Sequence, residues 1–165
     1  MDLIVDGYNL IGAADGLHGN LEPKRNWLIH KLAAYQRRKS FNIAVVFDGW
    51  RTGQANESRQ KHQGVNVVYS RIGEKADAVV VRLARQRGSG CVVITSDREI
   101  RHAVERFGVV AIYAAEFNQI LGRLDEGADT GDMEELDDPP IRGGNPNRAA
   151  KSDRKRQEKL KKLRL

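Results

Sequence analysis

Cysteine, proline and long apolar runs are all scarce in this chain. Cys91 is the single cysteine, which excludes a disulfide framework and a zinc site built from several cysteines. A reducing, cytoplasmic compartment fits that composition best. No apolar run approaches the length of a membrane-spanning helix, and Asp2 stands where a signal peptide would carry basic residues. We therefore expect neither a membrane span nor a secretory signal.

Charge, by contrast, is abundant and unevenly distributed. The 165 residues carry a formal net charge of +6 with a pI near 9.6, which favours a polyanionic partner such as nucleic acid. Residues 125–138 hold eight acidic residues and no Lys or Arg, whereas residues 142–165 hold ten basic and two acidic residues. We predict a domain over 1–124, an acidic and Pro/Gly-rich linker over 125–147, and a basic, helix-prone tail over 148–165.

The tail has two interpretations. It is a mobile, solvated extension whose oppositely charged blocks screen one another, or its basic part becomes an RNA-binding or ribosome-binding helix on contact. Both interpretations predict that the domain stays folded when residues 125–165 are deleted. The RNA-binding interpretation also predicts that this deletion weakens binding to long RNA or ribosomes.

Two hydrophobic periodicities alternate over the first 124 residues. Short β-branched runs predict strands at 3–5, 43–47, 65–69, 92–95 and 109–113, and helical periodicity predicts helices at 22–38, 74–87, 97–107 and 115–124. Such alternation is typical of an α/β fold with a mainly parallel central sheet and helices on both faces. The polar segment 48–64 predicts a loop or short helix near the C-terminal edge of the sheet.

Acidic residues follow three of these strands. Asp6 and Asp48 come directly after an apolar run, and Asp97 ends the stretch VVITSD at 92–97, so parallel strands would bring them to the same sheet edge. Asp77 borders the apolar stripe of the helix predicted at 74–87, with Glu74 one turn away. Clustered carboxylates repel and raise one another's pKa unless a divalent metal enters, and oxygen ligands favour Mg²⁺ or Mn²⁺ over Zn²⁺.

Each acid also has a structural interpretation. Asp6-Gly7 and Asp48-Gly49 are ordinary turn dipeptides. Ser96 with Glu99 three residues later forms a capping-box pattern, in which Asp97 would only favour a helix N-terminus. Convergence of the acids at one edge favours the metal site over these separate explanations.

Four short motifs in this order resemble the PIN-like NYN nucleases, specifically the YacP-like branch of bacterial endoribonucleases. They are VDGYN at 5–9, VFDG at 46–49, EKAD at 74–77 and ITSDRE at 94–99. The resemblance extends through nearly all of residues 1–124 and leaves the charged tail uncovered. One departure is Val81, which stands where members of this family often have Glu.

This resemblance implies a Rossmann-like PIN fold and a metal-dependent endoribonuclease. It implies that Asp6, Asp77 and Asp97 hold Mg²⁺ or Mn²⁺ and are catalytic, and that Asn9, Asp48 and Ser96 support them. Asp48 and Glu74 are further candidate metal ligands. Val81 in place of Glu would weaken metal binding.

An RNA substrate also requires a basic rim around the acidic cluster. The candidate rim residues are Arg51, Arg59, Lys61, Lys75, Arg98 and Arg101. The four histidines show neither metal-ligand spacing nor pairing, which argues against a histidine-based ribonuclease. A dinucleotide enzyme is disfavoured because the first turn, GYNLIG, lacks the GxGxxG spacing. The alternative that stays open is a non-catalytic RNA-binding or ribosome-binding module.

Overall fold

A computed structural model describes residues 1–49, 55–124 and 146–165. Arg51 and most of the predicted linker lie outside the described residues. The strands are β1 (Asp2–Asp6), β2 (Asn42–Phe47), β3 (Ser58–His62), β4 (Val65–Tyr69), β5 (Cys91–Ile94) and β6 (Val110–Ile112). The helices are α1 (Gly7–Asp15), α2 (Leu21–Lys39), α3 (Ala76–Arg87), α4 (Arg98–Glu105), α5 (Ala114–Gly122) and α6 (Pro146–Leu163), with a short 3-10 turn, η2 (Gly88–Gly90).

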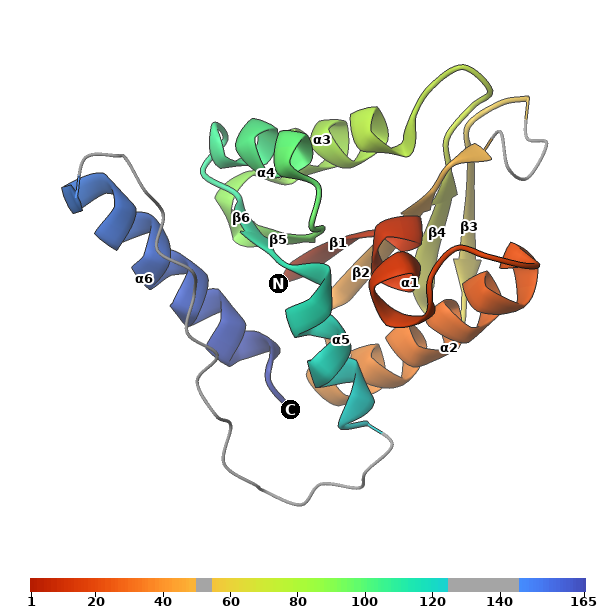
Figure 1. The fold of residues 1–165 in the computed structure, drawn as a ribbon, viewed down its shortest axis with the longest axis horizontal. Helices are drawn as coiled ribbons and strands as arrows, with labels where there is room; N and C mark the ends of the chain where they lie inside the picture. Colours follow the sequence, from red (N-terminus) through yellow and green to blue (C-terminus); the bar gives the residue numbers. More distant parts are fainter. Residues whose placement is uncertain (50–54, 125–145) are drawn as a thin grey trace.

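The described strands form one six-stranded sheet in the order β3-β4-β2-β1-β5-β6. All neighbours pair in parallel except β3 and β4, which are antiparallel. Helices α1, α2 and α5 cover one face, and α3 and α4 cover the other (Figure 1). The predicted α/β fold with a mainly parallel sheet is confirmed.

Both sheet faces are apolar because helices cover both. Along β1, Leu3 and Val5 enter the core under α1, α2 and α5, whereas Ile4 enters the core under α3 and α4. Side chains alternate between faces along a strand, so each strand must be apolar at successive positions. This places the carboxyl ends of β1, β2 and β5 at one common edge.

Helix α1 begins directly where β1 ends, at a place where the sequence had indicated a turn. Gly7 makes this possible, because a Cβ there would lie 2.3 Å from Phe47 Cε1 and 2.9 Å from the carbonyl oxygen of Val46. A side chain at residue 7 would therefore push the start of α1 away from the sheet. Asp6, Tyr8 and Asn9 are held against the strand ends as a result.

The segment 48–64 contains an edge strand, so the prediction of a loop or short helix there was wrong. β3 pairs with β4 through a tight turn at Gln63 and Gly64, whose φ angles are +51° and +94°. Two successive residues with positive φ are typical of a hairpin whose twist matches its strands. β3 is polar because it lies at the exposed sheet edge, and for that reason it lacks the apolar pattern of the other strands.

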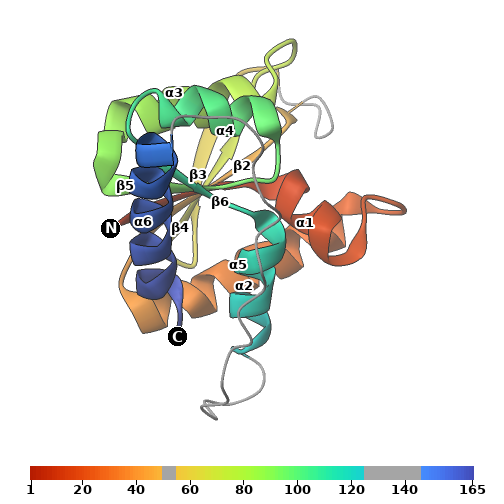
Figure 2. The ribbon, with the colours of Figure 1, turned by 60° about the vertical axis from the view of Figure 1, so that its left-hand side comes forward.

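Helix α6 stands beside β6 at the opposite edge of the sheet (Figure 2). Leu160 and Leu163 are buried in the core cluster, and the Tyr35 hydroxyl donates a hydrogen bond to the carbonyl oxygen of Leu163 at 2.6 Å. Arg156 pairs with Glu116 of α5 at 2.6 Å. The basic segment is thus a packed helix, which corrects the interpretation of this part of the tail as a solvated extension. No helix in the described ranges is long and apolar enough to cross a membrane.

Candidate active site

Asp6 is the most buried carboxylate at the C-terminal edge of the sheet. Asp6 is only 7% exposed, and the Thr95 hydroxyl donates a hydrogen bond to Asp6 Oδ2 at 3.1 Å. Burial raises the pKa of Asp6 to about 6, against the opposing effects of Thr95 and the backbone of Asn9; the charges of Asp77 and Asp97 raise it further. A cation nearby would therefore stabilise the charged form of Asp6.

Asp97 lies beside Asp6 at the start of α4. Its Oδ1 accepts hydrogen bonds from the backbone amides of Glu99 and Ile100 at 2.8 and 3.1 Å, so Asp97 is the N-cap. The predicted capping box with Ser96 as N-cap is wrong by one residue. Thr95 links the two acids, because it donates to Asp6 and accepts from the amide of Asp97 at 3.1 Å.

Asp77 and Asp48 complete the acidic edge. Asp77 is half-buried in the first turn of α3, and burial followed by the charge of Asp97 raises its pKa. Asp48 adds to this effect and Lys75 opposes it. The Ser70 hydroxyl donates to Asp48 Oδ1 at 3.3 Å. The structure therefore brings four predicted acids into one electrostatic neighbourhood, as strand topology required.

Two of the predicted supporting residues, Asn9 and Ser96, tie together the segments that carry the acids. Asn9 Oδ1 accepts a hydrogen bond from the backbone amide of Ser96 at 2.7 Å. Ser96 Oγ accepts one from the amide of Ala114 at 3.1 Å. Asn9 thus joins the start of α1 to the turn before α4, and Ser96 joins that turn to α5.

Glu74 is not brought to the acidic edge. It precedes α3, which begins at Ala76, so the helical spacing between Glu74 and Asp77 assumed from the sequence does not hold. Its carboxylate pairs with Arg82 at 2.8 Å and with Arg71 at 3.6 Å. Arg82 also pairs with Glu57, which precedes β3. This network fixes the segment that leads into Asp77.

The predicted rim residues differ in their surroundings. Lys61, Lys75 and Arg98 are exposed, whereas Arg59 pairs with Glu57 at 3.0 Å. The Arg101 guanidinium lies 3.5 Å from the centroid of the Tyr113 ring, a stacked arrangement. Arg51 lies outside the described ranges.

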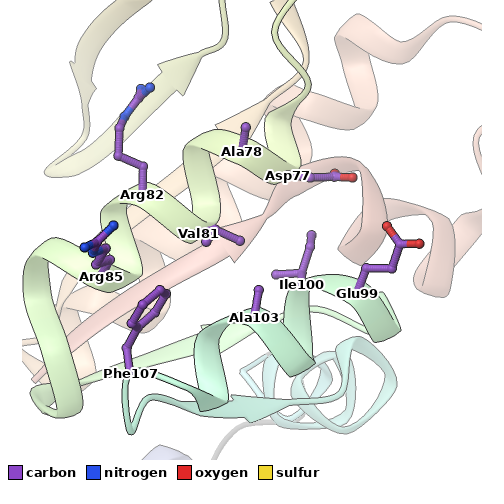
Figure 3. A pocket seen from close by; sticks show the side chains of 9 residues that line it. All are labelled: Asp77, Ala78, Val81, Arg82, Arg85, Glu99, Ile100, Ala103 and Phe107. Atoms are coloured by element: carbon purple, nitrogen blue, oxygen red, sulfur yellow. The ribbon is translucent and has the colours of Figure 1, made fainter.

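A groove of about 510 Å³ runs between α3 and α4 (Figure 3). Asp77 and Glu99 lie at one end of it, and Arg85 and Phe107 lie toward the other. Val81 lines its apolar wall one turn after Asp77. The position where the resemblance leads us to expect Glu is therefore adjacent to the acidic edge, but in this chain Val81 adds apolar surface there.

Two signals for the site were missed in the sequence. Thr95 and Ser70 are fully buried polar residues that hydrogen-bond to Asp6 and Asp48. Each follows an apolar run and stands at or directly after the end of a strand, as the acids do. A search of the sequence for any polar residue at the end of an apolar run, charged or neutral, would have identified both Thr95 and Ser70.

The side chains at the acidic edge show which kind of divalent metal site they could form. In residues 1–49, 55–124 and 146–165, no group of three or more His, Cys, Asp and Glu side chains could hold a metal ion. Mg²⁺ commonly binds one or two carboxylates together with waters and substrate phosphates, and does not need an all-protein cage. The oxygen-only donors and the raised pKa of Asp6 fit an open site of that kind.

Comparison with known proteins agrees with the motifs. A family model described as the YacP-like NYN domain matches residues 3–165, so the similarity includes α6, which the motif resemblance left uncovered. The chain is 36% identical over 87 residues to the uncharacterized protein YacP of Bacillus subtilis, covering 50% of this chain and 51% of that protein. The chain thus matches about half the length of this curated relative.

Solved structures of Rae1 (YacP) from Bacillus subtilis are similar in fold. One crystal structure has a TM-score of 0.60 at 29% identity and covers 76% of each chain. A mutant form of the same protein has a TM-score of 0.64 at 28% identity, covering 76% of this chain and 77% of that one. The predicted family resemblance is confirmed.

Proposed function

Because this chain belongs to the YacP-like NYN family, whose domain class is generally nucleolytic, we propose that its acidic sheet edge is the active site of a metal-dependent endoribonuclease. The observation that carries the proposal is the buried Asp6 carboxyl, whose pKa is raised to about 6 beside Asp77 and Asp97. A buried carboxylate among like charges destabilises the fold, and a cation would remove that cost. A site that gathers acids in this way is suited to binding a divalent ion and a phosphodiester together.

Asp6, Asp77 and Asp97 would hold Mg²⁺ or Mn²⁺, and Asp48, whose charge also acts on Asp77, is a further candidate ligand. When bound, the metal supplies charge neutralisation and lowers the pKa of a coordinated water. The protein contributes orientation: Thr95 fixes the Asp6 carboxylate through Oδ2, and the helix amides fix Asp97 through Oδ1. In this proposal Glu74 acts indirectly, through the Arg82 network that precedes α3.

RNA is the proposed substrate, and ribosome-associated RNA is a narrower form of the same proposal. The net charge of +6 supports a polyanionic partner. Helix α6 adds exposed cations beside β6, including Lys155, Lys161 and Lys162. The proposed location is the cytoplasm, where the buried thiol of Cys91 would stay reduced.

A non-catalytic RNA-binding or ribosome-binding module is the second candidate. Val81 favours it, because relatives often have a carboxylate at that position. The lack of a ready three-ligand cluster among the described side chains also favours it. Both candidates predict RNA binding, so only cleavage separates them.

The deciding experiment compares RNA cleavage by the wild-type chain and by Asp97→Asn, with Mn²⁺ and with a chelator. We expect cleavage by the wild type with metal only, and a loss of at least about 10²-fold in the variant, which keeps the cap but lacks the charge. Asp153→Asn, on the exposed surface of α6, is the matched control and should cleave normally. Wild-type protein that binds RNA but never cleaves it would support the binding module instead.

A further inference from the structure

Arg25 occupies an unusual position on the buried side of α2. It precedes Leu28, Ile29 and Leu32 at spacings of i+3, i+4 and i+7, so it continues the stripe that faces the sheet. Its residue is only half-buried because it lies in the first turns of the helix. An arginine on this stripe therefore directs its guanidinium toward the end of the sheet instead of toward solvent.

One tyrosine binds this guanidinium, and a second lies within reach of its charge. Arg25 Nη1 donates a hydrogen bond to the Tyr8 hydroxyl at 2.9 Å. Burial raises the pKa of Tyr69, and Arg25 opposes that rise, so the charge of Arg25 also acts on this second hydroxyl. Both tyrosine rings pack on Phe47: Tyr8 meets it edge to face at a centroid distance of 5.2 Å, and Tyr69 stacks on it at 5.8 Å. Arg25 is thus fixed in place by an aromatic support.

Both tyrosines lie near the acidic edge, Tyr8 in the first turn of α1 and Tyr69 at the end of β4. Tyr8 is two residues beyond Asp6, and Tyr69 directly precedes Ser70, which donates to Asp48. Asp77 lies on α3, which covers the opposite face of the sheet from α2 (Figure 1). Arg25 therefore flanks the acidic edge on the α1 and α2 side.

Among the described residues, Arg25 makes no ion pair with a carboxylate, although Glu22 stands one turn earlier on the same helix. The charge of Glu22 acts on the Tyr69 hydroxyl near Arg25, but within the described ranges no carboxylate forms an ion pair with this partly buried cation. A planar guanidinium held in one orientation is well suited to bind a phosphate through two hydrogen bonds.

We infer that Arg25 is an anchor for a non-scissile phosphate of the RNA strand, one that flanks the bond at the acidic edge. This inference rests on the proposed function, and it adds a positioning residue on α2 that no motif of the sequence indicates. The Tyr8 hydroxyl orients the guanidinium, and the bound phosphate supplies the ion pair that no carboxylate of the described residues provides. The RNA strand would then cross from the α1 and α2 side of the edge toward α3.

The test is the salt dependence of RNA binding in an Asp97→Asn background, measured by fluorescence anisotropy with a labelled single-stranded oligonucleotide. Arg25→Met should weaken binding about tenfold or more and reduce the slope of log K against log salt by about 0.7, the value for one lost phosphate contact. Arg37→Met, which removes an exposed charge from the last turn of the same helix, should leave the slope unchanged. Equal slopes and affinities for the two variants would overturn the assignment.

A second variant separates a binding role from a folding role. Arg25→Lys keeps the charge but loses the paired donors, so we expect weaker binding with an unchanged salt slope. Affinity equal to that of the background protein would contradict the inference, even if Arg25→Met failed to fold. With Asp97 restored and Mn²⁺ present, Arg25→Lys should raise KM and leave kcat nearly unchanged. If the wild type cleaves RNA and the Arg25 variants bind and cleave it equally well, only this inference is refuted. If the wild type does not cleave RNA at all, the proposed function is refuted.

Discussion

Replacing Asp6 by Asn should stabilise the metal-free protein and abolish its activity. The pKa of Asp6 rises from 3.8 to about 6 on folding, so the folded state holds this proton more tightly than the unfolded chain does. The free energy of unfolding of the wild type should therefore fall as the pH rises from about 4 to about 6, and then level off. The difference of about two pKa units corresponds to a loss of about 3 kcal/mol.

Urea denaturation at pH 4.5 and pH 8 in the presence of a chelator measures this effect. Asp6→Asn cannot titrate, so its stability relative to the wild type should rise by about 2 kcal/mol between the two pH values. A weaker hydrogen bond to Thr95 would lower its stability equally at both pH values and so would not change this difference. Asp153→Asn should follow the wild-type pH dependence. A wild-type stability that does not fall with pH relative to Asp6→Asn would refute the argument that Asp6 is destabilised by burial and by its neighbours.

Metal provides the complementary measurement on the same two proteins. At a Mn²⁺ concentration about 100 times the dissociation constant, the wild type should gain about 2.7 kcal/mol, because the ion binds only the folded state. Asp6→Asn should gain much less. Equal stabilisation of both proteins by Mn²⁺ would place the metal somewhere other than the acidic edge.

Three further predictions concern the rest of the site and the fold. Calorimetric titration with Mn²⁺ should show that Asp77→Ala weakens binding more than Glu74→Ala, since Glu74 is paired with arginines; the reverse order would contradict the assignment. Leu163→Ala should lower the free energy of unfolding by about 2–4 kcal/mol, whereas Leu165→Ala, at a 44% exposed position, should change it by less than about 0.5 kcal/mol; equal small effects would mean that α6 does not contribute to the core. RNA products should carry 5′-phosphate and 3′-hydroxyl ends, which end-specific ligation can identify, and 2′,3′-cyclic phosphate ends would indicate attack by the 2′-hydroxyl instead.

The packing of α6 changes the expected result of truncation. The sequence predicted that the domain folds without residues 125–165. Leu163 is fully buried and Leu160 nearly so, and Lys39 and Tyr35 of α2 bond to the backbone of the C-terminal segment. Removing these residues exposes apolar surface on the core. We therefore expect truncation before α6 to lower stability, so an effect on RNA binding must be measured with surface substitutions that keep Leu160 and Leu163.

The order of elements and the place of the acids could be predicted from the sequence. Apolar runs and helical stripes depend on local spacing, so β1, β2, β4, β5, β6 and four of the helices were identified within a few residues of their observed bounds. Parallel strands share the direction of their carboxyl ends, which is why Asp6, Asp48 and Asp97 had to meet at one edge. This part of the site follows from chain order and strand direction alone.

Other features depend on contacts between residues far apart in the chain, and only the tertiary structure decided them. Strand β3 owes its form to pairing with β4, and α1 starts at Gly7 because Phe47 leaves no room for a side chain. The pairing of Glu74 with Arg82, which keeps it from the acidic edge, depends on where α3 begins. The position of α6 is fixed by the packing of Leu160 and Leu163 into a core that is built from earlier parts of the chain. Local periodicity specifies which faces are apolar, whereas the folded chain specifies which partner each buried polar group and each apolar stripe receives.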